Sequence, residues 1–291
     1  MLRFSAHAEV RMGKSKFAAW GLGLAVLLGG GTDFAAETLG DLAHFDYDAS
    51  APLDVKQVSS KVQDGVTIQE ITYAGFNGGR VPAYLVIPKG AGKFAGIIWG
   101  HWLMPGAANS NRREFLEEAV RLAPAGVVSL LIDAPQNRPG FKPVPGSGPA
   151  IVAQQVIDLR RGLDLLRSRP YIDAARIAYV GHSFDAAIGA MLDATDKRFS
   201  AFVFMSGPQK MEMPKAWADP GSYAGKLGPA PALFQYGSHD EEWVPLAKAK
   251  EYVAMASGPK TVKFYDADHA LNAQARTDRD NFLSEKLNLH H

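Results

Sequence analysis

From Phe94 onward, the chain alternates between short, almost entirely apolar runs and longer segments with helical periodicity. This alternation restricts the fold most, because a strand that is apolar on both sides must be covered on both faces of its sheet. The pattern predicts an α/β fold, in which a mostly parallel central sheet carries helices on both faces. We expect strands at 94–99, 127–132, 176–180, 201–205, 232–236 and 261–265, and helices at 111–123, 151–167, 184–192, 245–256 and 271–287.

The segment before Phe94 has a different pattern. Residues 55–62, 66–73 and 81–88 alternate or are rich in β-branched side chains, and Asp64-Gly65 and Asn77-Gly78-Gly79 separate them. Turns of this kind join antiparallel strands, so we expect an antiparallel N-terminal part of the sheet. Residues 37–54 are polar and mixed, which predicts a leader that packs on the surface. Residues 55–291 then form one domain, whose ligand should bind at the carboxyl ends of the parallel strands.

Composition excludes several classes of protein. Among 291 residues the formal net charge is +1, so neither a nucleic acid nor an anionic membrane is expected as a partner. The chain has no cysteine, which excludes disulfides, thiolate metal sites and a cysteine nucleophile. The sequence contains no phosphate loop, no dinucleotide-binding fingerprint and no helical histidine pair with metal-ligand spacing. We therefore predict no metal and no cofactor.

The first 36 residues have the organisation of a secretory signal peptide. Basic residues precede the apolar run 17–28, and small residues lie around 35–36. The apolar run is shorter than the roughly 20 residues that a membrane-spanning helix needs. We predict a signal peptide at 1–36, a secreted or periplasmic location, and no membrane span in the mature chain. An uncleaved anchor or a buried helix is the alternative.

The stretch Gly181-His182-Ser183-Phe184-Asp185 lies between the expected strand 176–180 and the helix that follows it. This is the arrangement of a nucleophile elbow, where a strand turns sharply into a helix and presents a serine at the apex. The turn also directs the backbone N–H of Phe184 to where an oxyanion would form. The usual motif is G-x-S-x-G, and here Asp185 replaces the second glycine, which adds bulk and charge near Ser183.

A serine hydroxyl needs a base, and the base needs a group that orients it. Asp240 follows strand 232–236, and His269 follows strand 261–265, so the chain order is Ser183, Asp240, His269. This is the order expected with an elbow nucleophile. We predict that Asp240 is the acid and His269 the base. The competing residues are His182 and His239 for the base and Asp133, Glu241, Glu242, Asp266 and Asp268 for the acid.

The second oxyanion donor should come from the loop after strand 94–99. The backbone N–H groups of Trp102 and Leu103 are the two candidates, and the sequence does not separate them. Because these donors are backbone groups, side-chain identity carries little information about them.

Together, Val180-Gly181-His182-Ser183-Phe184, Gly100-His101-Trp102, Gly237-x-x-Asp240-x-x-Val244-Pro245 and Asp268-His269-Ala270 resemble the α/β-hydrolase superfamily. The likeness is to its dienelactone-hydrolase-like and bacterial serine esterase branches, and it covers roughly residue 55 to the C-terminus. It implies that Ser183, Asp240 and His269 are nucleophile, acid and base, and that Phe184 helps form the oxyanion hole. There are departures. Dienelactone hydrolases use a cysteine nucleophile, and the family's usual His-Gly is His101-Trp102 here.

Large apolar side chains in loops at the expected site suggest an apolar substrate pocket. We predict substrate contacts from Trp102, Met104, Phe141, Trp217 and Trp243, and a small cap or lid formed by residues 206–229. The resulting hypothesis is a serine hydrolase that cleaves small-molecule carboxylic esters. Amide or peptide hydrolysis on the same residues is one alternative. A non-catalytic binding protein, in which Asp185 blocks the elbow or attracts His269, is the other. The oligomeric state stays open.

Overall fold

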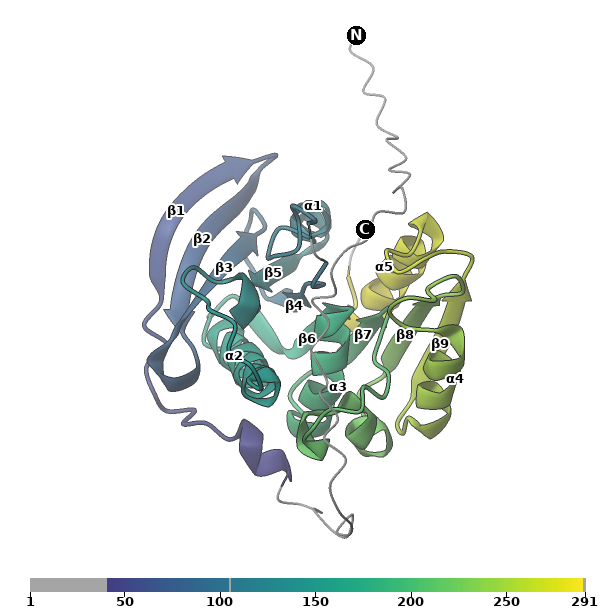
Figure 1. Ribbon diagram of the computed structural model, residues 1–291. Coiled ribbons are helices and arrows are strands. Elements are labelled where there is room, and N and C mark those ends of the chain that lie inside the picture. The colour runs from purple at the N-terminus through teal and green to yellow at the C-terminus, as the bar shows by residue number, and fades with distance from the viewer. Residues whose placement is uncertain (1–40, 105, 290–291) are drawn as a thin grey trace. The chain divides into compact units, whose positions relative to one another are not determined.

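The computed structural model describes residues 41–104 and 106–289 (Figure 1). The predicted signal peptide lies outside the described residues. The strands are β1 (Lys56–Gln63), β2 (Val66–Ala74), β3 (Arg80–Ile87), β4 (Phe94–Gly100), β5 (Val127–Ile132), β6 (Ile172–His182), β7 (Ala201–Met205), β8 (Ala232–Gly237) and β9 (Lys260–Tyr265). The α-helices are α1 (Leu116–Leu122), α2 (Gly148–Arg167), α3 (Phe184–Thr195), α4 (Leu246–Met255) and α5 (Ala273–Leu287).

The described strands form one sheet in the order β1-β2-β3-β5-β4-β6-β7-β8-β9. The pairs β1–β2, β2–β3 and β3–β5 are antiparallel, and every later pair is parallel. The predicted α/β architecture with antiparallel N-terminal strands is therefore confirmed. Because β4 to β9 run in one direction, the residues that follow them gather at one edge of the sheet.

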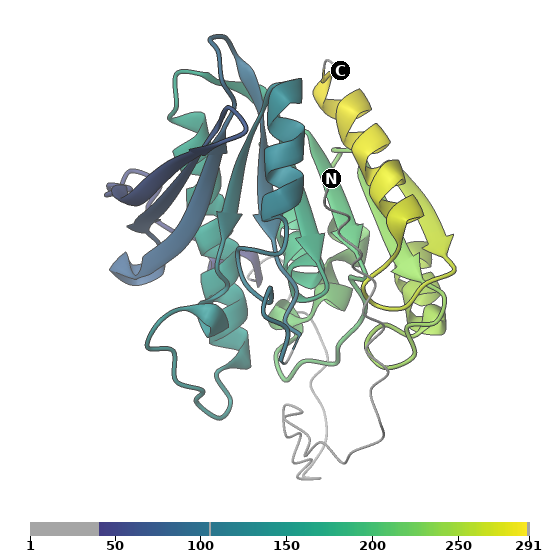
Figure 2. The ribbon, with the colours of Figure 1, turned by 90° about the horizontal axis from the view of Figure 1, so that it is seen from above.

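Helices cover both faces of the sheet, and each face has its own apolar core. Side chains of α2, α3 and α4 pack on one face, and those of α1 and α5 pack on the other (Figure 2). The pleat of β4 divides its side chains between them, since Ile98 belongs to the first core and Ile97 and Trp99 to the second. Both faces of the parallel strands are thus buried, as their continuous apolar sequence requires. Among the described residues, none of the helices has the length and apolar character that crossing a membrane requires.

Helix α1 begins at Leu116, whereas the apolar periodicity predicts a start at residue 111. Long-range contacts hold the preceding residues in turns. The N–H of Arg112 donates to Asp133 Oδ1 at 2.8 Å, and the Arg112 guanidinium pairs with both Asp133 and Glu70. These contacts come from the sheet, so periodicity within the segment could not predict where the helix starts.

The described part of the predicted leader, residues 41–54, contributes to the core. Phe45, in the short 3-10 helix η1 (Asp41–Phe45), is fully buried. Arg161 of α2 is buried as well, and it donates to the backbone carbonyls of Asp48, Ala51 and Pro52. The segment is therefore attached by both apolar packing and hydrogen bonds.

Residues 206–229 contain two 3-10 helices, η5 (Ala216–Ala218) and η6 (Pro220–Lys226). Tyr223 and Leu227 are buried in the core that includes α3. Trp217 stacks on His44 of η1, with ring centroids 4.1 Å apart. Much of the segment is thus packed into the domain, and a lid function for it stays a prediction.

Candidate active site

Ser183 lies at the sharp turn between β6 and α3. Its φ of 54° and ψ of −109° are unusual for a residue with a side chain, as expected at the apex of an elbow. The turn brings α3 very close to β6. A Cβ atom on Gly181 would lie 2.3 Å from the carbonyl oxygen of Asp185, so this position has no space for a larger residue.

The carboxyl edge of the sheet brings Ser183, His269 and Asp240 into one hydrogen-bonded chain. Ser183 Oγ lies 2.7 Å from His269 Nε2, and His269 Nδ1 lies 2.6 Å from Asp240 Oδ2. His269 and Asp240 are buried, and Ser183 is half-buried. In this arrangement the serine hydroxyl donates to Nε2, and the Nδ1 proton faces the carboxylate. A nucleophile, a base and an orienting acid require this geometry.

Asp240 is held as a carboxylate. Burial alone would raise its pKa, but the hydrogen bond and charge of His269 and the N–H groups of Val244 and Trp243 hold the pKa below its ordinary value. An ionised Asp240 can orient the imidazole and stabilise its protonated form.

Glu241 and Glu242, two of the competing acids, are exposed, and most of the other competing residues have partners of their own. Asp133 pairs with Arg112 at 2.5 Å, and Asp266 pairs with His239 on the exposed surface. Asp268 Oδ1 accepts the N–H of Ala270. His182 points away from Ser183, since its Nδ1 lies 2.5 Å from Glu114 Oε1 and its Nε2 faces the carbonyl oxygen of His269.

The two candidate donors in the loop after β4 are not equivalent. The N–H of Trp102 donates to Glu114 Oε2 at 2.7 Å, so it is not available to an oxyanion in this arrangement. Across residues 41–104 and 106–289, the N–H groups of Leu103 and Phe184 donate to no protein acceptor. The geometry therefore favours Leu103 and Phe184. Glu114 could not be identified from the sequence, because no local signal distinguishes it from the other acidic residues near α1.

Asp185 lies beside the site without touching its reacting groups. Its buried carboxyl accepts hydrogen bonds from Gln155 Nε2 at 2.9 and 3.2 Å and from the N–H of His101. Burial raises its pKa to about 8, so the group is largely neutral at pH 7. Gly100 provides the space, because a Cβ atom there would lie 2.5 Å from the Asp185 Cβ. One form of the non-catalytic alternative requires a contact between Asp185 and His269, and this contact is absent from the described residues.

His101 connects the ends of β4 and β5. Its Nε2 accepts the N–H of Ala134 at 2.9 Å, so its Nδ1 carries the proton that faces the carbonyl of Trp102. Burial lowers the pKa of His101, which favours this neutral form. The oxyanion loop thus starts from a fixed residue.

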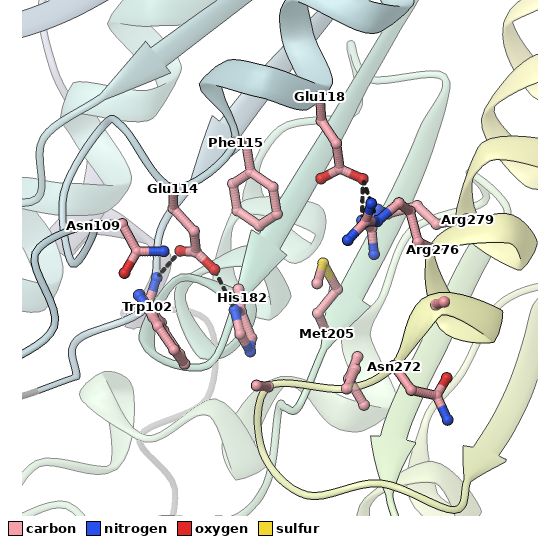
Figure 3. Close-up of a pocket in the computed structure, with 13 residues that line it drawn as sticks. Trp102, Asn109, Glu114, Phe115, Glu118, His182, Met205, Asn272, Arg276 and Arg279 are labelled. Carbon is pink, nitrogen blue, oxygen red and sulfur yellow. Dashed lines mark hydrogen bonds and ion pairs between the residues drawn. The ribbon is translucent and has the colours of Figure 1, made fainter. Parts of the chain in front are cut away.

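The predicted substrate-contact residues lie in different places. Trp243 is 40% exposed, and its ring centroid lies 5.9 Å from that of His269. Leu103 and Met104 line a hollow of about 420 Å³. Trp102 stacks on His182 and faces a polar cavity of about 300 Å³ (Figure 3). Trp217 packs against η1 instead of lining the site, and a substrate contact by Phe141 stays a prediction.

Solved structures with the same architecture include an acetyl xylan esterase from Paenibacillus sp. R4, which aligns with a TM-score of 0.68 at 19% sequence identity over 86% of this chain and 100% of the other. The chain has the α/β-hydrolase fold. Acetyl xylan esterase 1 from Thermoanaerobacterium sp. JW/SL YS485 has a TM-score of 0.67 at 14% identity, over 84% of this chain and 91% of the other. A cold-adapted esterase from an Arctic intertidal metagenomic library has a TM-score of 0.60 at 16% identity, over 80% and 99%.

No protein-family model matches the sequence, and the search of curated proteins gave no match. The structural alignments, however, confirm the α/β-hydrolase fold that the sequence resemblance implied. At these identities the likeness shows the fold alone, so the activity must be argued from the site.

Proposed function

We propose that this protein is a serine hydrolase that cleaves carboxylic esters of small molecules. The observation that carries the proposal is the chain Ser183 Oγ–His269 Nε2 at 2.7 Å and His269 Nδ1–Asp240 Oδ2 at 2.6 Å, with the serine at a strained turn before a helix. The esterases with the same fold support this class of substrate.

In the proposed reaction, Ser183 Oγ attacks the ester carbonyl carbon while its proton passes to His269 Nε2. The carbonyl oxygen becomes an oxyanion, which the N–H groups of Phe184 and Leu103 stabilise. The C–O bond to the alcohol then breaks, and the alcohol leaves with the proton from His269. A water molecule attacks the acyl-enzyme by the same route and releases the acid and free Ser183.

We assign the acyl group to the hollow lined by Leu103 and Met104, beside the proposed oxyanion donor. The exposed ring of Trp243 lies on the side of His269 and would contact the alcohol part. Esters, whose leaving alcohols need less assistance than amines, suit this partly open arrangement.

The test is hydrolysis of a p-nitrophenyl ester series, from acetate to octanoate, by the purified protein and by Ser183→Ala. We expect turnover by the parent that the substitution abolishes, and stoichiometric labelling of Ser183 by a fluorophosphonate. A folded parent that neither turns over any ester nor accepts the label would refute the proposal. The chain length with the highest kcat/KM measures the size of the acyl region.

We propose further that residues 1–36 direct export, which the basic and apolar pattern of this segment supports. Expression of the full chain in a Gram-negative host should deliver a shortened protein to the periplasm, and the chain without residues 1–36 should stay in the cytoplasm. N-terminal sequencing of the periplasmic protein locates the cleavage. Full-length protein in the membrane fraction would favour an uncleaved anchor instead.

A further inference from the structure

The side chain of Glu114 lies between two loops of the candidate active site. It is 9% exposed and comes from the turn that precedes α1. Its Oε2 accepts the N–H of Trp102 at 2.7 Å, and its Oε1 lies 2.5 Å from His182 Nδ1 (Figure 3). The carboxylate thus contacts the loop after β4, which carries Leu103, and the histidine that precedes Ser183.

His182 extends this connection to the loop that carries the candidate base. Its Nε2 lies 3.0 Å from the carbonyl oxygen of His269, and Ser206 Oγ donates to the same oxygen at 2.7 Å. The rings of Trp102, His182 and His269 are stacked, with centroids 5.1 and 5.5 Å apart in turn. The backbone of His269 is therefore held separately from its ring, which Asp240 orients.

The hydrogen positions in this network follow from its acceptors. A carbonyl oxygen can only accept, so His182 Nε2 must carry a proton. A glutamine at position 114 could keep every contact, because its oxygen can accept from Trp102 and its amide can donate to an unprotonated His182 Nδ1. An alanine at this position would remove both contacts.

We propose that Glu114 is a positioning residue that holds the oxyanion loop and the base loop in register across the elbow. It touches no reacting atom, and it acts through Trp102 N–H on one side and through His182 on the other. Misplacement of catalytic groups by about 1 Å can lower a rate on the order of 10²-fold. This inference rests on the proposed ester hydrolysis through Ser183.

Glu118 offers a matched control. It lines the same 300 Å³ cavity one turn further along, but its carboxylate pairs with Arg279 and Arg121 instead of a group of the site. The variants are Glu114→Ala, Glu114→Gln, Glu118→Ala and Glu118→Gln. For each, kcat and KM with p-nitrophenyl acetate, the rate of fluorophosphonate labelling and the midpoint of thermal unfolding are measured.

We expect Glu114→Ala to lower kcat and the labelling rate on the order of 10²-fold with little change in KM. Glu114→Gln should recover most of that loss. Glu118→Ala should lower the unfolding midpoint, because it leaves the buried Arg279 without the carboxylate that it pairs with, while kcat stays near that of the parent.

A folded Glu114→Ala variant with parental kcat would overturn the proposal, and so would an equal loss of kcat in Glu118→Ala. A Glu114→Gln variant as slow as Glu114→Ala would overturn it too, because the rate would then depend on the charge of Glu114 and not on its hydrogen-bond geometry. If Glu114→Ala does not fold, Ser206→Ala removes a donor to the same carbonyl and should lower kcat to a smaller extent. Parental kcat in that variant counts against the proposal. A parent that is itself inert refutes the proposed function instead.

Discussion

Two aspartates beside the elbow, Asp240 after β8 and Asp185 at the start of α3, have the same side chain and opposite pKa shifts. Both carboxyls are buried. The partners of Asp240 hold its pKa below the ordinary value, whereas burial raises the pKa of Asp185 to about 8. Burial alone therefore does not decide whether a carboxyl in this region is charged.

The difference lies in the partners. Asp240 faces a histidine that can become a cation, and two backbone N–H groups point at it. Asp185 receives hydrogen bonds from an amide and a backbone N–H, and neither provides a full positive charge. One carboxyl can thus stabilise a developing imidazolium, while the other packs as a largely neutral group at the same edge of the sheet.

The largest effect is expected when the charged member of this pair is neutralised. Asp240→Asn should lower kcat for p-nitrophenyl acetate on the order of 10⁴-fold, because an amide favours the wrong tautomer of His269. The fold should persist, since asparagine has nearly the same shape. Circular dichroism and the unfolding midpoint check the fold. A loss of only a few-fold would mean that another group orients His269.

Asp185→Asn, at the neutral member of the pair, tests the protonation of Asp185 through the pH dependence of stability. Its folded pKa of about 8 exceeds the ordinary value of 3.8, so the folded state holds a proton that the unfolded state has lost between those pH values. The contribution of protonated Asp185 to the free energy of unfolding is complete below about pH 4. Between about pH 4 and pH 8 this free energy falls by up to about 1.4 kcal/mol per pH unit. Asp185→Asn should remove this slope and be more stable than the parent above pH 8. Urea unfolding at a series of pH values measures the effect.

Asp185→Gly is the matched variant for activity. Because Asp185 touches neither Ser183 nor His269, we expect no gain of turnover, and some loss of stability from the space left beside Gly100. An inert parent made active by glycine would restore the view that Asp185 blocks the elbow.

The smallest effect is expected at a histidine–aspartate pair outside the site. His239 Nε2 lies 2.5 Å from Asp266 Oδ1, but both side chains are mostly exposed. His239→Ala should change the free energy of unfolding by less than about 1 kcal/mol and leave kcat unchanged. A large loss of kcat would mean that His239 acts as the base or shares that role with His269.

The fold could be predicted largely because its signals are local. Apolar runs marked the parallel strands, and Ser183, Asp240 and His269 stood out because each follows such a run. Their hydrogen-bonded geometry required the structure, as did the choice of Leu103 over Trp102.

The features that sequence reasoning missed depend on contacts between distant segments. Glu114 lies in a stretch whose periodicity indicated a helix. The contacts of Arg112 with Asp133 and Glu70 hold this stretch in turns, so the helix begins only at Leu116. The neutral state of Asp185 depends on its burial by segments that are distant in the chain, among them the helix that carries Gln155. Trp217 stacks on His44, which lies far earlier in the chain, instead of lining the site.

The attachment of residues 41–54 has a consequence for where the chain can be cut. Within the described residues, Arg161 donates to four backbone carbonyls, and only that of Ala74 lies outside this segment. A protein shortened to begin at residue 55 would keep every strand that the structure describes. It would, however, leave the buried guanidinium of Arg161 without most of its acceptors and an empty space where Phe45 packs. The smallest self-sufficient unit among the described residues therefore includes Phe45 and the segment between it and β1.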